Sequence, residues 1–128
     1  MRMKEVCERT GLTDRAIRLY MENGLVKPKQ ESNYMGRCSY TFDEQDVRVL
    51  EAIATLRRAE FSIADIAEMQ SSPESLPAIV AEHRKRLAQD IATKQQILGS
   101  LVQCDAQAQK DYATLAASIS AQILTSAR

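Results

Sequence analysis

Apolar residues along the chain recur mostly at the three- and four-residue spacing of helices, with short interruptions. Two short apolar groups, at residues 4–10 and 14–22, are separated by Gly11 and Leu12, which predicts two helices joined by a tight turn. Thr13 is placed to cap the second helix, because its hydroxyl can accept a hydrogen bond from a free backbone amide. This pattern is typical of a helix-turn-helix.

Residues 25–42 lack helical periodicity and predict a small two-stranded ribbon. The segments 25–28 and 38–42 carry the apolar, aromatic and β-branched residues that favour strands. The polar stretch 30–37 between them is expected to form the connecting loop. A ribbon that directly follows a helix-turn-helix is called a wing, and this name is used for it below.

Two more helices are predicted after the wing, at about 43–59 and 62–70. Thr41 and Glu44 have the spacing of a capping box at the start of the first, with Asp43 as a competing cap. Residues 71–74 then form a boundary that contains a proline.

The longest predicted helix covers about residues 75–104. Its large apolar residues recur at steps of seven, four, seven and three, which is a heptad-like row and predicts packing against a second helix. This row consists of Val80, Leu87, Ile91, Leu98 and Leu101. Residues 105–128 predict a last helical segment with few large apolar residues.

The composition indicates a folded, mostly α-helical protein. Apolar residues make up 45% of the 128 residues and charged residues 27%, whereas aromatic residues make up only 5%. A β-sandwich or barrel would need more aromatic and β-branched residues. The predicted fold is therefore mostly α, with a winged helix-turn-helix and a small β-ribbon.

The formal net charge is zero, but the charge is unevenly distributed. Residues 1–42 carry a net charge of +3, residues 43–74 carry −5 and residues 75–128 carry +2. This balance excludes a polycation that coats nucleic acid through bulk charge. It leaves room for a local basic surface near the first two helices.

The second predicted helix carries the candidate chemistry. If Ile17 and the Tyr20 ring face the core, then the basic side chains of this helix face outward, as in helices that enter the DNA major groove. Periodicity alone fits a solvated basic helix as well, but the preceding turn and the following wing favour DNA. The candidate DNA-binding residues of this helix are Thr13, Arg15, Arg18, Leu19 and Tyr20.

Four blocks of sequence, at 4–13, 16–20, 22–26 and 42–47, resemble the winged-helix DNA-binding domain of MerR-family transcriptional regulators. The resemblance covers residues 1 to about 70, and the order and spacing of the blocks make it specific.

This resemblance implies a homodimer whose long helices pair in an antiparallel coiled coil. Such regulators bind a pseudo-palindrome in an over-long promoter spacer and distort it, so that RNA polymerase can read both promoter elements. The implied domains are a DNA-binding domain at 1–70, a dimerisation helix at 71–104 and a C-terminal helical segment at 105–128. The heptad-like row of the long helix would form the dimer interface.

The resemblance also implies roles for single residues. Arg18 and Tyr20 match the arginine and second tyrosine that hold phosphates, whereas Leu19 replaces the first tyrosine. The family's wing often carries Tyr-Arg-x-Tyr. Here residues 39–42 lack the arginine, and we expect Arg37 to act in its place beside Tyr40. Arg57 and Arg58 match a second wing that meets the DNA backbone, although a solvated helix end explains them equally well.

Metal and cofactor chemistry has little support in the sequence. His83 and Cys104 could approach each other across an antiparallel dimer, but two ligands do not complete a metal site. Cys7, Cys38 and Cys104 are expected to be reduced thiols. We predict no cofactor and no metal, leave a small-molecule or metal effector unidentified, and expect no enzyme activity, no membrane span and a cytoplasmic location.

Two alternatives stay open at the level of sequence. One is a helical module that uses its helix pair and wing for protein contacts. The other is an architectural or accessory DNA-binding factor without an inducer. The sequence is also compatible with a piece of a longer protein whose effector domain lies beyond Arg128.

Overall fold

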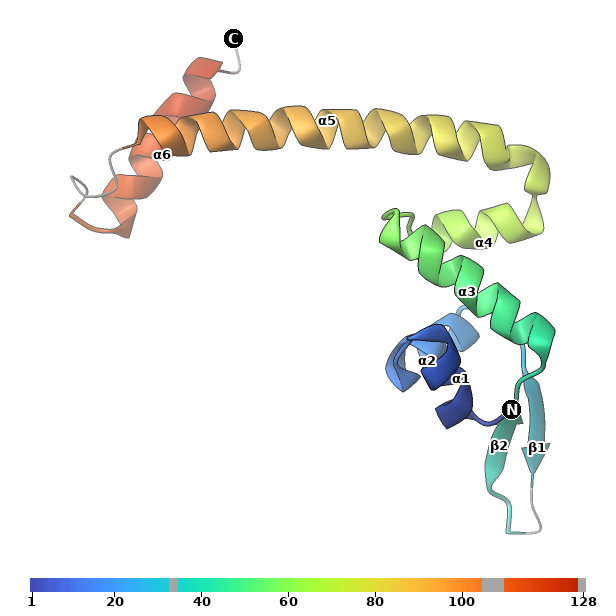
Figure 1. Ribbon diagram of the computed structural model, residues 1–128. Helices are drawn as coiled ribbons and strands as arrows, with labels where there is room; N and C mark the ends of the chain where they lie inside the picture. Colours follow the sequence, from blue (N-terminus) through green and yellow to red (C-terminus); the bar gives the residue numbers. More distant parts are fainter. Residues whose placement is uncertain (33–34, 105–109, 127–128) are drawn as a thin grey trace. The chain divides into compact units, whose positions relative to one another are not determined.

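The computed structural model describes residues 1–32, 35–104 and 110–126, and is mostly helical (Figure 1). The chain divides into two compact units, Met1–Ile79 and Val80–Arg128. The boundaries at residues 70 and 104 separate segments with different expected functions, and they stay a prediction. Among the described helices, none is both long and apolar enough to cross a membrane.

The first unit begins with the predicted helix-turn-helix, α1 (Met3–Thr10) and α2 (Asp14–Glu22). Gly11 ends α1 in the left-handed conformation, with φ at 74°, and its amide donates to the Cys7 carbonyl. The Thr13 hydroxyl oxygen accepts from the Ala16 amide at 3.0 Å, which caps α2 as predicted. The two caps fix where each helix stops and starts.

The wing is an antiparallel pair, β1 (Lys29–Ser32) and β2 (Cys38–Thr41), with Lys29 opposite Thr41 and Ser32 opposite Cys38. The second strand lies where the sequence predicted it. Residues 33 and 34 of the predicted loop lie outside the described residues.

The prediction of the first strand at 25–28 was wrong. Leu25 and Val26 are each 4% exposed and belong to the core instead. The Leu25 amide donates to the Tyr20 carbonyl and its carbonyl accepts from Gln70, so neither group is left for a strand partner. Pro28 has no amide hydrogen to give to a strand ladder.

The next helices are α3 (Glu44–Arg58) and α4 (Ile63–Ser71), close to the predicted ranges. Asp43, the competing cap, is the one used. Its carboxylate accepts from the Asp46 amide at 2.8 Å, and the Asp46 carboxylate accepts from the Asp43 amide at 3.0 Å. The predicted pairing of Thr41 with Glu44 was therefore wrong. Glu44 instead forms a two-point ion pair with Arg9, which joins α3 to α1.

A tight turn joins α3 to α4. Glu60 takes the left-handed conformation there, with φ at 69°, although it is not a glycine. The Phe61 amide donates to the Leu56 carbonyl, and the Arg57 guanidinium donates to the Phe61 carbonyl at 2.9 Å. Arg57 thus has a structural contact that closes the end of α3.

The core of the first unit draws on α1–α4, the segment after α2, the end of the wing and the start of the long helix. This single cluster explains why two short helices and a two-stranded ribbon are stable together, since none buries enough surface alone. The buried members are Val6, Ile17, Tyr20, Leu25, Val26, Phe42, Val47, Leu50, Ile53, Phe61, Ile66, Met69 and Ile79.

A 3-10 turn, η1 (Pro73–Ser75), leads into the longest helix, α5 (Leu76–Gln103), which confirms the long predicted helix. The last helix, α6 (Tyr112–Ser126), is shorter than the predicted segment 105–128. Residues 105–109 and 127–128 of that prediction lie outside the described residues.

Candidate nucleic-acid interface

The outward face of α2 borders a hollow of about 880 Å³. Ile17 is fully buried and Tyr20 is 6% exposed, so these two side chains turn the opposite face of the helix to solvent. That face carries two cations three residues apart, Arg15 and Arg18, and it is the face that a helix in the DNA major groove turns to the bases. The hollow is lined by Thr13, Asp14, Arg15, Ala16, Arg18, Leu19, Tyr20, Glu22 and Arg57.

Two outward residues of α2 differ in how they are held. Arg18 forms an ion pair with Asp14 one turn earlier, and both side chains are more than half exposed. This pair orients the guanidinium but adds little stability, because water screens it. Leu19 is 41% exposed and offers the solvent-facing side of α2 an apolar group beside the two arginines.

The end of α3 adjoins α2. A second hollow, of about 620 Å³, is lined by Tyr20 from α2, by Arg57 and Arg58 from α3, and by the turn at Gly11. Arg57 and Tyr20 line both hollows, so the two form one continuous surface. The structure thus brings Arg57 and Arg58 beside the α2 residues, whereas their predicted contact with the DNA backbone stays a prediction.

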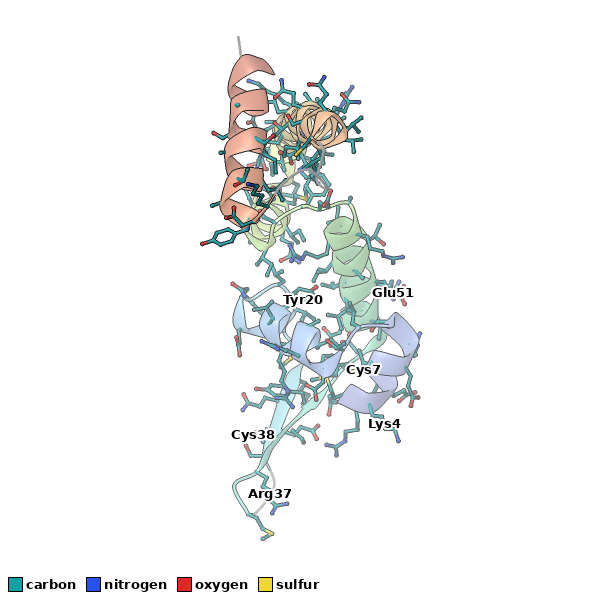
Figure 2. All side chains as sticks on the ribbon, turned by 90° about the vertical axis from the view of Figure 1, so that its left-hand side faces the viewer. Lys4, Cys7, Tyr20, Arg37, Cys38 and Glu51 are labelled. Carbon is teal, nitrogen blue, oxygen red and sulfur yellow. The ribbon has the colours of Figure 1, made fainter. Side chains whose placement is uncertain are left out.

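The wing contributes Tyr40, which is half-buried and lines a smaller hollow together with Arg18 and Lys27. Arg37 is exposed and lies at the far end of the hairpin, away from α2 (Figure 2). The structure therefore brings Tyr40 to the α2 surface and leaves Arg37 apart from it.

Three cations beside α2 were not predicted from the sequence. Lys27 shares the small hollow with Arg18, and Arg2 and Lys4 line another one with Arg18 and Tyr40. The net charge of +3 over residues 1–42 was the available signal. It could not assign these residues to a surface, because Arg2 precedes α1, Lys4 lies in α1 and Lys27 follows α2.

Two cysteines near this surface have shifted pKa values. Hydrogen bonds from Ser32 and Gln30 lower the pKa of the exposed Cys38 thiol. Burial, with the nearby Asp14 carboxylate, raises the pKa of the Cys7 thiol. Cys38 is therefore the more readily ionised of these two thiols.

The heptad-like row of α5 is largely exposed within one chain. Val80 is 42% exposed, Ile91 57%, Leu98 62% and Leu101 47%, whereas Leu87 is half-buried. Ile97 and Val102 are also exposed, and the sequence row did not include them. An apolar row of this length on a water-facing helix indicates a surface that packs against another helix.

The residues weighed as metal ligands do not assemble a site within one chain. His83 is 8% exposed, and the Cys104 sulfur lies 3.7 Å from the Ser118 hydroxyl oxygen. Over the described ranges, no three His, Cys, Asp or Glu side chains gather closely enough to hold a metal ion.

Comparisons with known proteins agree with this geometry. Residues 1–72 match the family described as MerR HTH family regulatory protein, which is more than half of the chain. The chain is 32% identical over 99 residues to the HTH-type transcriptional regulator CueR of Vibrio cholerae serotype O1, covering 73% of this chain and 68% of that one. The Salmonella typhi CueR is 28% identical over 94 residues, covering 72% and 64%.

A solved structure shows the same fold. The transcription regulator PbrR691 from Ralstonia metallidurans CH34, determined in complex with lead(II), superposes with a TM-score of 0.63 at 18% identity, covering 87% of this chain and 93% of that one. These relatives are transcriptional regulators and not enzymes. The chain therefore belongs to the MerR family of helix-turn-helix, DNA-binding transcriptional regulators.

Proposed function

We propose that this chain binds a pseudo-palindromic DNA site as a homodimer, distorts that site, and so controls whether RNA polymerase can use the promoter. The observation that carries the proposal is the continuous surface formed by the outer face of α2 and the end of α3, with Arg15, Arg18 and Arg57 along it. Family membership supports the same function.

Each part of this surface has a role that suits its chemistry. Thr13 and Arg15, in the first turn of α2, reach base edges, because the start of a recognition helix lies deepest in the groove. Arg18, Tyr20 and Arg57 hold phosphates at the flanks. Further phosphate contacts come from Arg58 at the end of α3 and from Arg37 and Tyr40 in the wing.

The exposed apolar row on α5 supports the proposed dimer. Ile91 and Leu98, both more than half exposed, stay in water unless another helix covers them. A second copy of α5 in antiparallel orientation can pack its own apolar row against this one. Both subunits then use the same surface, as a two-fold symmetric interface requires. Two DNA-binding units then face two half-sites, and this arrangement explains why the site must be a pseudo-palindrome.

The zero net charge of the chain fits a mechanism in which the protein distorts DNA. A chain with zero net charge gains little from bulk attraction to DNA, so its specificity must come from placed contacts and from DNA shape. Bending the segment between two half-sites lets both recognition helices make their contacts together. The affinity then depends on how easily that segment deforms.

The experiment begins with selection of binding duplexes from a randomised library. Titration of the selected duplex by fluorescence anisotropy, at several salt concentrations, is compared with a scrambled duplex of equal composition. Sedimentation of the free protein gives its mass, and end-to-end energy transfer on the duplex measures bending. We expect a palindromic sequence, twice the chain mass of 14.3 kDa and a shorter end-to-end distance on binding.

Other outcomes contradict particular parts of the proposal. A monomer without DNA affinity would favour a protein-interaction module. A dimer that binds the scrambled duplex equally well would favour an architectural factor.

A further inference from the structure

The hollow between α1, α2 and the wing is cationic. It has a volume of about 280 Å³ and is lined by three cationic residues, Arg2, Lys4 and Arg18, with no carboxylate among its lining residues. Ser39 and Tyr40 add hydroxyl groups on the wing side. Cys38, on the wing, also lines this hollow. Lys4, on α1, and Cys38 are both labelled in Figure 2.

The charges of this hollow are incompletely balanced by the protein itself. Arg18 is paired with Asp14, but within the described part of the chain the structure gives neither Arg2 nor Lys4 an ion pair. Cations that share one hollow repel each other, and an anion placed among them relieves that repulsion. The hydroxyls nearby can donate hydrogen bonds to the oxygens of such an anion.

We propose that this hollow holds a phosphate of the DNA backbone, with Arg2 and Lys4 as additional DNA-binding residues. The inference rests on the proposed function, because it uses Arg18 as the link. Arg18 lines both this hollow and the large hollow on α2. A DNA strand that passes Arg18 on the outer face of α2 therefore runs past the mouth of the three-cation hollow as well.

The consequence is a wider interface than the recognition helix alone provides. The segment before α1 and the first turn of α1 become part of the DNA-binding surface. Arg2 and Lys4 read no base, because a phosphate carries no sequence information. They fix how far α2 is inserted and raise the affinity for all sequences alike.

The test uses the double variant Arg2→Gln and Lys4→Gln in the full chain, with a matched control in which Lys85→Gln and Arg86→Gln remove the same charge from exposed positions of α5 that lie off the face of Val80, Leu87 and Ile91. Binding of the selected duplex and of its scrambled form is measured from low to moderate salt. Each lost phosphate contact lowers the slope of log affinity against log salt by about 0.9. We expect the salt slope of the double variant to fall by the equivalent of one to two phosphate contacts, equally on both duplexes. The salt slope of the control should change less.

A second arm identifies the phosphate. Single phosphates of the selected duplex are replaced, one at a time, by neutral methylphosphonates. One replacement should weaken binding of the wild type and leave the double variant unaffected. Cys38, on the rim of the same hollow, should also be alkylated more slowly in the DNA complex, whereas Cys7 serves as the internal reference.

The outcomes separate this inference from the proposed function. A wild type that binds DNA, with an unchanged salt slope in the double variant, overturns the phosphate site and leaves the proposed function standing. A wild type with no affinity for any duplex overturns both. Binding of inorganic phosphate to the free protein, lost in the double variant but without any change in the salt slope, would assign the hollow to a free anion and also overturn the proposal.

Discussion

At the scale of single residues, two buried side chains of α2 decide which face of that helix meets solvent. Ile17 and the Tyr20 ring face the core as the helical spacing required, because a short helix beside a core has only one way to bury two large side chains. The bond from Arg57 to the Phe61 carbonyl could not be predicted. It depends on a turn whose shape is set by the left-handed Glu60, a conformation that no sequence pattern indicated.

Leu19 gives the first prediction. Because its side chain has no hydrogen-bonding group and is 41% exposed beside Arg15 and Arg18, its contact with DNA must be apolar, and the methyl group of thymine is the apolar feature of the major groove. Replacing one thymine of the selected duplex by deoxyuridine should cost about 0.8 kcal/mol, roughly fourfold in affinity. The variant Leu19→Ala should lose this sensitivity. Equal sensitivity of wild type and variant at every thymine would contradict the role.

The two shifted thiols give a second prediction, on pH dependence. Alkylation requires the thiolate, so the rate rises as the pH passes the pKa of the thiol. Because the pKa of Cys38 is lowered and that of Cys7 is raised, the rate at Cys38 should reach its plateau at the lower pH. Peptide mass spectrometry after iodoacetamide treatment measures both rates. In the variant Ser32→Ala the Cys38 profile should move to higher pH, and an unmoved profile would rule out the assigned hydrogen bond.

At the scale of elements, helices were predictable and the first strand was not. Caps and periodicity located α1–α4 within a residue or two, because those signals are local. Leu25 and Val26 are residue types that favour strands, yet both are buried in the core. The strand begins three to four residues later and consists of the polar stretch Lys29–Ser32. Tertiary packing decided this segment, and a local pattern carries no information about it.

The cap of α3 gives the third prediction. Asp43→Ala removes the carboxylate that accepts from the Asp46 amide, whereas the backbone amide of residue 43 can still donate to the Asp46 carboxylate. The free energy of unfolding should fall by about 1 kcal/mol. Gln45→Ala, at an exposed position in the same turn, is the matched control. Urea denaturation of both variants measures the difference, and equal losses would show that the capping box contributes nothing.

At the scale of the whole molecule, the sequence predicted the fold class and the family but not the extent of the proposed DNA-binding surface. The four matching blocks specify α1, α2, the segment after α2 and the start of α3, and all of these lie in the first compact unit. Arg2 and Lys4 joined the surface only once α1 was placed beside the wing. Surfaces built from several elements depend on packing, and charge counts along the chain do not reveal them.

The proposed dimer gives the fourth prediction, which belongs to this scale. Replacing Ile91 and Leu98 by glutamate places two charges in the exposed row of α5, where a partner helix would have to bury them. The protein should then sediment at the single-chain mass of 14.3 kDa and lose its preference for palindromic over half-site duplexes. Gln89→Glu with Gln96→Glu, also seven residues apart but on another side of the helix, is the control. Retention of dimer mass in the Ile91 and Leu98 variant would exclude this row as the interface.

The position of Arg57 has a consequence for how the protein can evolve. Its guanidinium closes the α3–α4 turn and also lines both hollows beside α2, so a substitution there faces two selective constraints at once. Arg58, its neighbour, lines one hollow and faces only one of them. Lysine at position 58 would keep the positive charge beside the hollow. Lysine at position 57 could not replace the planar guanidinium, which both donates to the Phe61 carbonyl and lines the two hollows. Sequence drift should therefore be slow at 57 and fast at 58, and a saturation library scored for repression or activation of a reporter would show tolerated variants concentrated at the second site.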